Sequence, residues 1–165
     1  MRDGPRLSHH ISERAGARHR SRAGISRSVE GPMHRTTYAE VHERARRLAK
    51  RLEGDGIRGG DRVATLAWNT WRHLEAWYGI TGVGAVYHTV NPRLFAAQLA
   101  YTVNHAEARL LLLDLPFLPL VDQLAAALPT TARFVILPAP AHLPQPRLPG
   151  PAPHHASSPA LPAAF

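Results

Sequence analysis

The sequence predicts an α/β fold in which helices flank a parallel sheet, and two observations support this prediction. Between about residues 62 and 137, short apolar runs alternate with segments of helical length, which is the pattern of βαβ units. The run Leu110–Leu113 is apolar at every position, as in a strand that is buried on both faces of a sheet. Since parallel strands need crossover connections, we expect right-handed crossovers that contain helices.

The central part of the chain contains a βαβ unit. Asn69 and Thr70 are expected to cap its helix with their side-chain oxygens. Gly82 and Gly84 are expected to end that helix. The unit consists of a strand, a helix and a second strand in that order: Arg62–Ala67, Trp71–Gly82 and Ala85–Thr89.

A helix is expected before this unit. Thr37 and Glu40 have the spacing of a capping box, in which each side chain satisfies a backbone amide of the other residue. Gly54 and Gly56 can end the helix. Apolar residues recur at helical spacing, namely Val41, Ala45, Leu48, Ala49 and Leu52. Basic residues fit a solvated helix face better than a phosphate site: Arg44, Arg46, Arg47, Lys50 and Arg51.

The N-terminal region divides into a tail and a possible hairpin. Residues 1–24 show no periodicity and many polar residues, so we expect a disordered basic tail. Ile25–Val29 and Met33–Thr37 are separated by a turn at Glu30–Pro32 and are compatible with a small hairpin. Residues 25–137 are therefore predicted to form the folded region.

Two further helix–strand pairs follow the central unit. One helix is marked by Phe95, Leu99 and Val103 and ends near Asn104–His105, before the apolar strand at Leu110–Leu113. The last strand is expected at Phe134–Leu137. The second helix has an apolar stripe that Pro129 closes: Leu118, Val121, Ala125 and Leu128.

The C-terminal segment, residues 138–165, differs in composition from the rest. It contains nine prolines and seven alanines among its 28 residues and has no acidic residue. Such a segment is expected to be disordered with polyproline II character. Reading a GC-rich gene out of frame tends to give strings of this kind, so we hypothesise a frameshifted ending. The first 24 residues are open to the same explanation.

Composition limits the classes of function. The chain has 165 residues, a net charge of +8 and no cysteine, which favours one cytoplasmic domain and excludes a disulfide scaffold. It has no apolar run of roughly 18 residues that could span a membrane. The arginine excess precedes the first predicted helix. Nucleic-acid binding is therefore a weak alternative, in which a basic module binds polyanions.

Most motifs that carry chemistry are missing. There is no G-x-G-x-x-G dinucleotide fingerprint, no phosphate loop of the G-x-x-x-x-G-K-[ST] type and no G-x-S-x-G elbow. The eleven histidines do not have the spacing of a metal site. Four residues of the central helix could line an apolar pocket, although packing against a sheet explains them better: Trp71, Leu74, Trp77 and Tyr78.

Several short motifs, taken in order, resemble the N-terminal part of the AMP-forming acyl-CoA synthetases, the adenylate-forming superfamily. They are Gly56–Ala64, Asn69, Gly84–Val86 and Val90–Leu94. Within that superfamily the chain is similar to the medium- and long-chain fatty-acid–CoA ligases, through these further stretches: Thr37–Glu40, Trp68–Thr70, His73–Glu75, Asn91–Phe95 and Asn104–Glu107.

The resemblance implies a two-step reaction for the full-length relatives. A fatty-acid carboxylate attacks the α-phosphorus of ATP to give an acyl-adenylate, and the CoA thiol then displaces AMP, with Mg²⁺ stabilising the phosphoryl charge. The family's phosphate loop, adenylate motif, ribose-binding aspartate and C-terminal lysine come from later sequence, and residues 1–165 contain none of them.

We therefore assign no catalytic, cofactor-binding or metal residue to this chain. We expect an inactive N-terminal fragment that binds no fatty acid, ATP, Mg²⁺ or CoA by itself. We also expect it to self-associate or aggregate, because it carries only part of the family's layers. A protein that docks on an intact ligase is a further alternative.

Overall fold

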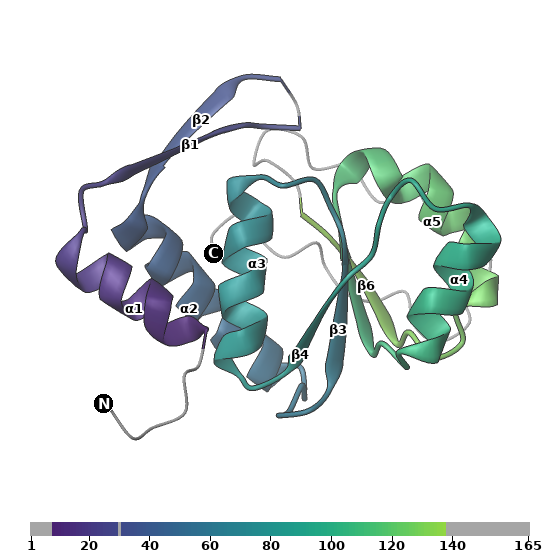
Figure 1. The fold of residues 1–165 in the computed structure, drawn as a ribbon. Coiled ribbons are helices and arrows are strands. Elements are labelled where there is room, and N and C mark those ends of the chain that lie inside the picture. Colours follow the sequence, from purple (N-terminus) through teal and green to yellow (C-terminus); the bar gives the residue numbers. More distant parts are fainter. Residues whose placement is uncertain (1–7, 30, 138–165) are drawn as a thin grey trace. The chain divides into compact units, whose positions relative to one another are not determined.

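The computed structural model describes residues 8–29 and 31–137, which divide between two compact units (Figure 1). Of these residues, 8–29, 31–61 and 69–87 belong to the first unit, and 62–68 and 88–137 belong to the second. The predicted α/β class with a parallel sheet is confirmed. The predicted disordered tail at 138–165 and its frameshift explanation lie outside the described residues.

The first unit contains three helices and a hairpin within its described residues. The hairpin is antiparallel, with Ile25 opposite Arg35 and Arg27 opposite Met33. It begins two residues earlier than predicted. In chain order the elements are α1 (His9–Arg18), β1 (Ala23–Arg27), β2 (Met33–Thr37), α2 (Tyr38–Gly54) and α3 (Trp71–Gly82).

Helix α1 differs from the prediction that residues 1–24 are disordered. Its buried face consists of small residues, Ser12 and Gly16, instead of a stripe of large apolar ones. Ser12 Oγ lies 3.1 Å from His42 Nδ1 on α2. A Cβ at Gly16 would lie 2.9 Å from His42 Cβ, so close packing on α2 requires the glycine. The helix therefore packs without the apolar periodicity on which sequence reasoning depends.

Helix α2 begins with the predicted capping box. The Thr37 N–H donates to Glu40 Oε2 at 2.7 Å, and the Glu40 N–H donates to Thr37 Oγ1 at 3.2 Å. Four of the five predicted apolar positions are buried, and the fifth is half-buried. The buried ones are Val41, Ala45, Leu48 and Leu52.

Helix α3 has the predicted bounds, but its N-terminus is not capped as predicted. Thr70 occupies the N-cap position and makes no side-chain cap hydrogen bond. The Trp71 N–H instead donates to Ser26 Oγ of β1 at 3.3 Å, and Asn69 Oδ1 lies 3.2 Å from His73 Nδ1. The hairpin thus supplies an oxygen that the local sequence was expected to supply.

The sheet has four strands in the order β4–β3–β5–β6. Val63 of β3 pairs with Leu110 of β5, and Leu113 of β5 pairs with Ile136 of β6, both in parallel ladders. All four residues of β5 are buried, as its uniformly apolar sequence predicted. The strands are β3 (Arg62–Leu66), β4 (Val86–Thr89), β5 (Leu110–Leu113) and β6 (Arg133–Ile136).

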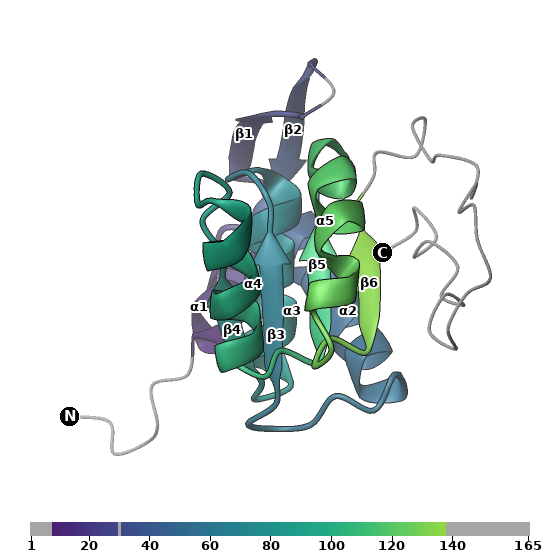
Figure 2. The same cartoon turned by 90° about the vertical axis from the view of Figure 1, so that its right-hand side faces the viewer.

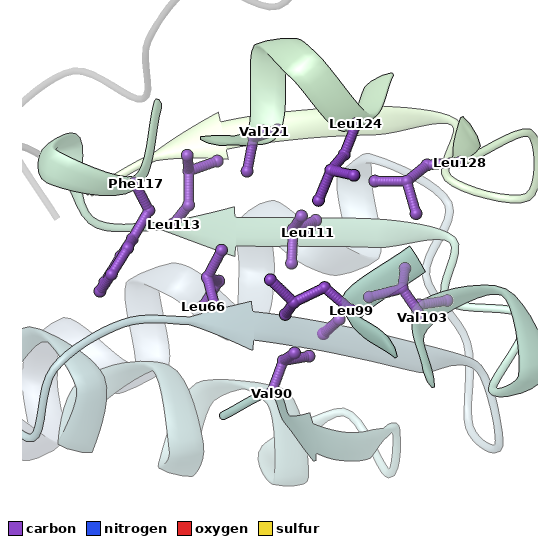
Figure 3. Close-up of a cluster of buried hydrophobic side chains, with 12 residues drawn as sticks. Leu66, Val90, Leu99, Val103, Leu111, Leu113, Phe117, Val121, Leu124 and Leu128 are labelled. Carbon is purple, nitrogen blue, oxygen red and sulfur yellow. The ribbon is translucent and has the colours of Figure 1, made fainter. Parts of the chain in front are cut away.

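In the second unit, α4 (Ala96–His105) and α5 (Leu118–Leu124) cover one face of β3, β5 and β6 (Figure 2). Figure 3 shows the core between these layers, where leucine and valine side chains of the helices meet Leu66, Leu111 and Leu113. Short 3₁₀ turns, η1 (Leu115–Phe117) and η2 (Ala125–Ala127), flank α5.

The second helical stripe was predicted with one error. Ala125 was assigned to the apolar face, but it is exposed and begins η2, and Leu124 is the buried residue. Leu124 and Ala125 lie three and four residues after Val121, and both spacings fall on the same face of a helix. Spacing alone therefore did not decide which of the two is buried, and Leu128 is buried as predicted.

Candidate functional site

The strand order locates a candidate site in the second unit. The chain passes from β3 to the edge strand β4 and then returns across β3 to β5. In open parallel sheets, ligands bind outside the carboxyl ends of the strands at the point where the order reverses. For this chain that point lies where β3 and β5 end.

Asp114 connects the two strand ends at this point. It follows β5 directly and is fully buried. Its Oδ2 accepts a hydrogen bond from the Trp68 N–H at 2.8 Å, and its own N–H donates to the Leu66 carbonyl at 3.1 Å. Because its carboxylate holds the backbone after β3, Asp114 acts as a positioning residue where β3 and β5 end.

Two aromatic side chains lie near these strand ends, an exposed one, Trp68, and a buried one, Phe117. The Trp68 ring lies 5.3 Å from the Phe117 ring, and Trp68 remains 41% exposed. Such a surface can contact an apolar or planar group. Among residues 8–29 and 31–137, no three histidine, cysteine or acidic side chains form a cluster that could hold a metal ion. The region where β3 and β5 end therefore combines an exposed aromatic ring with the buried carboxylate of Asp114.

A charged cluster lies in the first unit. Arg44 Nε is 2.8 Å from Glu75 Oε1, and both Glu75 and Arg72 are buried. The Arg44 and Arg72 guanidinium carbons lie 4.8 and 5.2 Å from the centre of the Trp71 ring. The His34 ring stacks on Trp71 with 4.2 Å between the centroids.

Burial shifts the pKa values of Glu75 and His34 in this cluster. It raises the pKa of the Glu75 carboxyl to about 7, against the opposing effect of the Arg44 guanidinium. Burial also lowers the pKa of His34, and the charge of Arg44 lowers it further. Buried titratable groups are common at functional sites, although structural ion pairs show the same shifts.

The basic face of α2 is only partly the solvated surface that was predicted. Arg46 and Arg47 are more than half exposed. Arg47 Nε lies 3.2 Å from Glu43 Oε1. Arg44 is the exception, because its side chain reaches Glu75 on α3. Glu75, an acidic residue in the mostly apolar helix α3, was the sequence feature that could have indicated this ion pair.

The four residues that might have lined an apolar pocket have different surroundings, although the Trp77 and Tyr78 rings stack with 5.7 Å between their centroids. Trp71 belongs to the charged cluster, while Trp77 is exposed and its ring centroid lies 6.1 Å from that of Tyr87. Tyr78 lines a cavity of about 260 Å³ whose other lining residues are mostly polar, including Ser12, Arg46 and Lys50. The structure therefore does not support an apolar substrate pocket on α3.

His73 forms part of a hydrogen-bonded chain in the first unit. Its Nε2 is hydrogen-bonded to the Tyr87 hydroxyl, and its Nδ1 to the Asn69 side chain. Burial lowers the pKa of His73. With both ring nitrogens engaged, the imidazole joins β4 to the start of α3 and is held in one orientation.

Comparison with known proteins assigns the family. A family described as AMP-binding enzyme matches residues 12–161. The chain belongs to the AMP-binding enzyme family. The match runs past the limits of 25 and 137 that the motifs suggested, and at its N-terminal end it includes most of α1.

Two relatives of this chain are fatty-acid–CoA ligases. It is 50% identical over 125 residues to the long-chain-fatty-acid–CoA ligase of Thermus thermophilus, covering 76% of this chain and 23% of the relative. It is 42% identical over 127 residues to the medium-chain-fatty-acid–CoA ligase of Ectopseudomonas oleovorans, covering 77% and 23%. The chain thus spans about a quarter of the length of these relatives.

Solved structures confirm the fold. The fatty acyl CoA synthetase of Mycobacterium tuberculosis matches with a TM-score of 0.72 at 23% identity, covering 79% of this chain and 26% of that one. An anthranilate CoA ligase, AuaEII, matches with the same TM-score of 0.72 at 24% identity, covering 83% and 27%. Among the described residues, no helix is both long and apolar enough to cross a membrane.

Proposed function

We propose that this chain is the N-terminal part of an enzyme that joins a fatty acid to CoA through an acyl-adenylate. The observation that carries the proposal is the 50% identity to a long-chain-fatty-acid–CoA ligase over 125 residues, or 76% of this chain. The whole enzyme would use ATP, Mg²⁺, CoA and a fatty acid, and we place it in the cytoplasm.

We further propose that the 165 residues alone are inactive and bind none of these ligands. The ends of β3 and β5 carry aromatic side chains and a positioning carboxylate. The printed sequence contains no loop that could cradle phosphates. In this proposal the segment is a scaffold, and the groups that stabilise the transferring phosphoryl group come from other sequence.

A chimera tests both parts of the proposal. Residues 25–137 would replace the matching segment of the Thermus thermophilus ligase, and ATP–pyrophosphate exchange would be measured with a long-chain fatty acid. We expect exchange by the chimera and none by the 165-residue chain. A folded chimera without exchange would contradict the assignment to a ligase, whereas exchange by the chain alone would contradict only its inactivity.

The segment alone is also proposed to self-associate. Strands β4 and β6 are the edges of the sheet, and unpaired edges pair with other chains. Several large apolar side chains are exposed, including Phe95 and Tyr101. Light scattering at micromolar concentration should show oligomers, and a monomer with one reversible unfolding transition would contradict this proposal.

A further inference from the structure

The hairpin β1–β2 has one packed face and one open face. On the packed face, Ser26 accepts a hydrogen bond from the Trp71 N–H, and His34 stacks on the Trp71 ring. Residues directly opposite in an antiparallel pair share a face of the sheet. The alternating burial of both strands therefore places the following residues on the open face: Ala23, Ile25, Arg27, Met33, Arg35 and Thr37.

This open face combines apolar and basic side chains. Ile25 is 52% exposed and Met33 is 63% exposed. Each lies opposite an exposed arginine, since Ile25 pairs with Arg35 and Met33 pairs with Arg27. None of the six residues of the open face is acidic, and the one carboxylate that contacts them in the described hydrogen bonds is that of Glu40, which accepts from Thr37 Oγ1 at 2.9 Å. We call these six residues the basic apolar face; the hairpin that carries it is labelled in Figure 1.

The segment that leads into β1 adds positive charge. Arg20 and Arg22 lie just before the strand, and both are exposed. The Arg22 carbonyl accepts a hydrogen bond from the Tyr38 N–H at 3.0 Å, so the backbone of this segment is held at the end of the hairpin. Four exposed arginines are therefore attached to one short, hydrogen-bonded element.

We infer that the basic apolar face binds the surface of an anionic lipid bilayer. Ile25 and Met33 would enter the boundary between headgroups and acyl chains, while Arg27 and Arg35 would pair with lipid phosphates. A guanidinium binds phosphate in a bidentate manner. Nucleic acid would satisfy the arginines but would leave the two aliphatic side chains in water, so the lipid surface fits the face better. This inference does not depend on the proposed ligase activity.

Vesicle co-sedimentation tests the inference with the 165-residue chain. Vesicles of phosphatidylglycerol and phosphatidylcholine would be compared with vesicles of phosphatidylcholine alone, after a spin that removes any aggregate. We expect binding to the anionic vesicles, weakening as salt increases, and little binding to the neutral ones. Equal binding to both kinds of vesicle would overturn the charge part of the inference.

Two double variants separate the contributions of charge and apolar contact. Arg27→Gln with Arg35→Gln should lower the partition coefficient about 25-fold, or roughly fivefold per arginine. Ile25→Thr with Met33→Thr keeps the charge and the strand propensity and should lower it about tenfold. All four side chains replaced are exposed, so circular dichroism should show an unchanged fold.

A matched control removes the same charge elsewhere. Arg47 on α2 and Arg93 are exposed and lie outside the hairpin. Arg47→Gln with Arg93→Gln should change binding less than about threefold, because screening limits distant charges. If this control binds as weakly as the Arg27/Arg35 variant, the hairpin arginines have no special role and the inference is wrong. The inference is also wrong if the Ile25/Met33 variant binds vesicles as well as the parent does and RNA displaces the vesicles from the chain.

Discussion

Arg44 and Glu75 form the ion pair that joins α2 to α3, with 2.8 Å between Arg44 Nε and Glu75 Oε1. The two side chains differ in exposure, at 28% for Arg44 and 7% for Glu75. The arginine can keep part of its hydration if the pair is broken, whereas the carboxylate cannot. The cost of ionisation in this pair therefore falls mainly on Glu75.

This asymmetry predicts an unusual pH dependence of stability. Glu75 has a pKa of about 7 in the folded chain, raised mainly by burial, against a reference value of 4.5. Between these pH values the folded state binds more protons than the unfolded state. The stability that the protonated Glu75 adds to the folded state is therefore lost as pH rises through 7. Relative to Glu75→Gln, the parent should lose up to about 3 kcal/mol of unfolding free energy between pH 4.5 and 8.

Urea unfolding of both proteins across that pH range measures the effect. Glu43→Gln is the matched control, because Glu43 is half exposed and pairs with Arg47 on the same helix. Its difference from the parent should stay nearly constant with pH, since exposed pairs contribute about 0–1 kcal/mol. A Glu75→Gln difference that also stays constant would show that Glu75 titrates normally.

The second prediction concerns Gly79, where α3 packs closely against α2. A Cβ at this position would lie 2.9 Å from Leu48 Cδ2 and 3.0 Å from the Ala45 carbonyl oxygen. Overpacking of this kind costs about 1–3 kcal/mol, which exceeds the roughly 1 kcal/mol of helix propensity that alanine adds. Gly79→Ala should therefore lower the thermal midpoint and the urea midpoint.

Gly82 on the same helix is the control for that prediction. A Cβ there would meet only Ala49 Cβ, at 3.7 Å, which is an ordinary contact. Gly82→Ala should leave stability unchanged or raise it by up to about 1 kcal/mol. If both alanine variants shift the midpoint in the same direction, close packing does not explain the glycine at 79.

Sequence reasoning located most of the regular elements because their determinants are local. The capping box at Thr37, the uniformly apolar run at Leu110–Leu113 and the helix over Trp71–Gly82 each depend on neighbouring residues. Helix α1 was missed because it packs through Ser12 and Gly16. These residues stabilise the helix only by contacting His42, which lies about 30 residues away in the sequence. Small residues that allow close approach leave no periodic pattern.

The candidate site could be predicted less well than the fold. The strand order that places Asp114 beside Trp68 is a property of the whole sheet. No local sequence motif predicts the hydrogen bond between them. The same holds for Arg44, which looks like one more arginine of a basic helix until Glu75 is placed against it. In both cases a buried acidic residue beside apolar ones was the available clue.

The capping box of α2 gives a third prediction. Thr37→Ala removes the oxygen that accepts the Glu40 N–H and should cost about 1 kcal/mol, whereas Thr37→Ser should cost a few tenths. The backbone N–H of Thr37 holds the pKa of Glu40 below its usual value. The stabilisation that the ionised Glu40 carboxylate adds to the fold is therefore present above pH 4.5 and is lost as pH falls. Urea unfolding at pH 7 ranks the variants, and equal losses for alanine and serine would exclude the cap as the cause.

Asp114 gives the last prediction, because its carboxylate is the acceptor that connects the ends of β3 and β5. Asp114→Ala would remove the Oδ2 acceptor that lies 2.8 Å from the Trp68 backbone nitrogen in a partly buried hydrogen bond. An unsatisfied buried donor costs about 1–3 kcal/mol. Asp114→Asn keeps an oxygen in place and should be more stable than the alanine variant by about that amount.

Hydrogen exchange at the Trp68 amide separates this effect from a general loss of stability. In the alanine variant this amide should exchange faster relative to the amides of β5, and in the asparagine variant it should keep most of its protection. If the two variants unfold at the same urea concentration and protect Trp68 equally, the side chain at 114 does not hold the strand ends together.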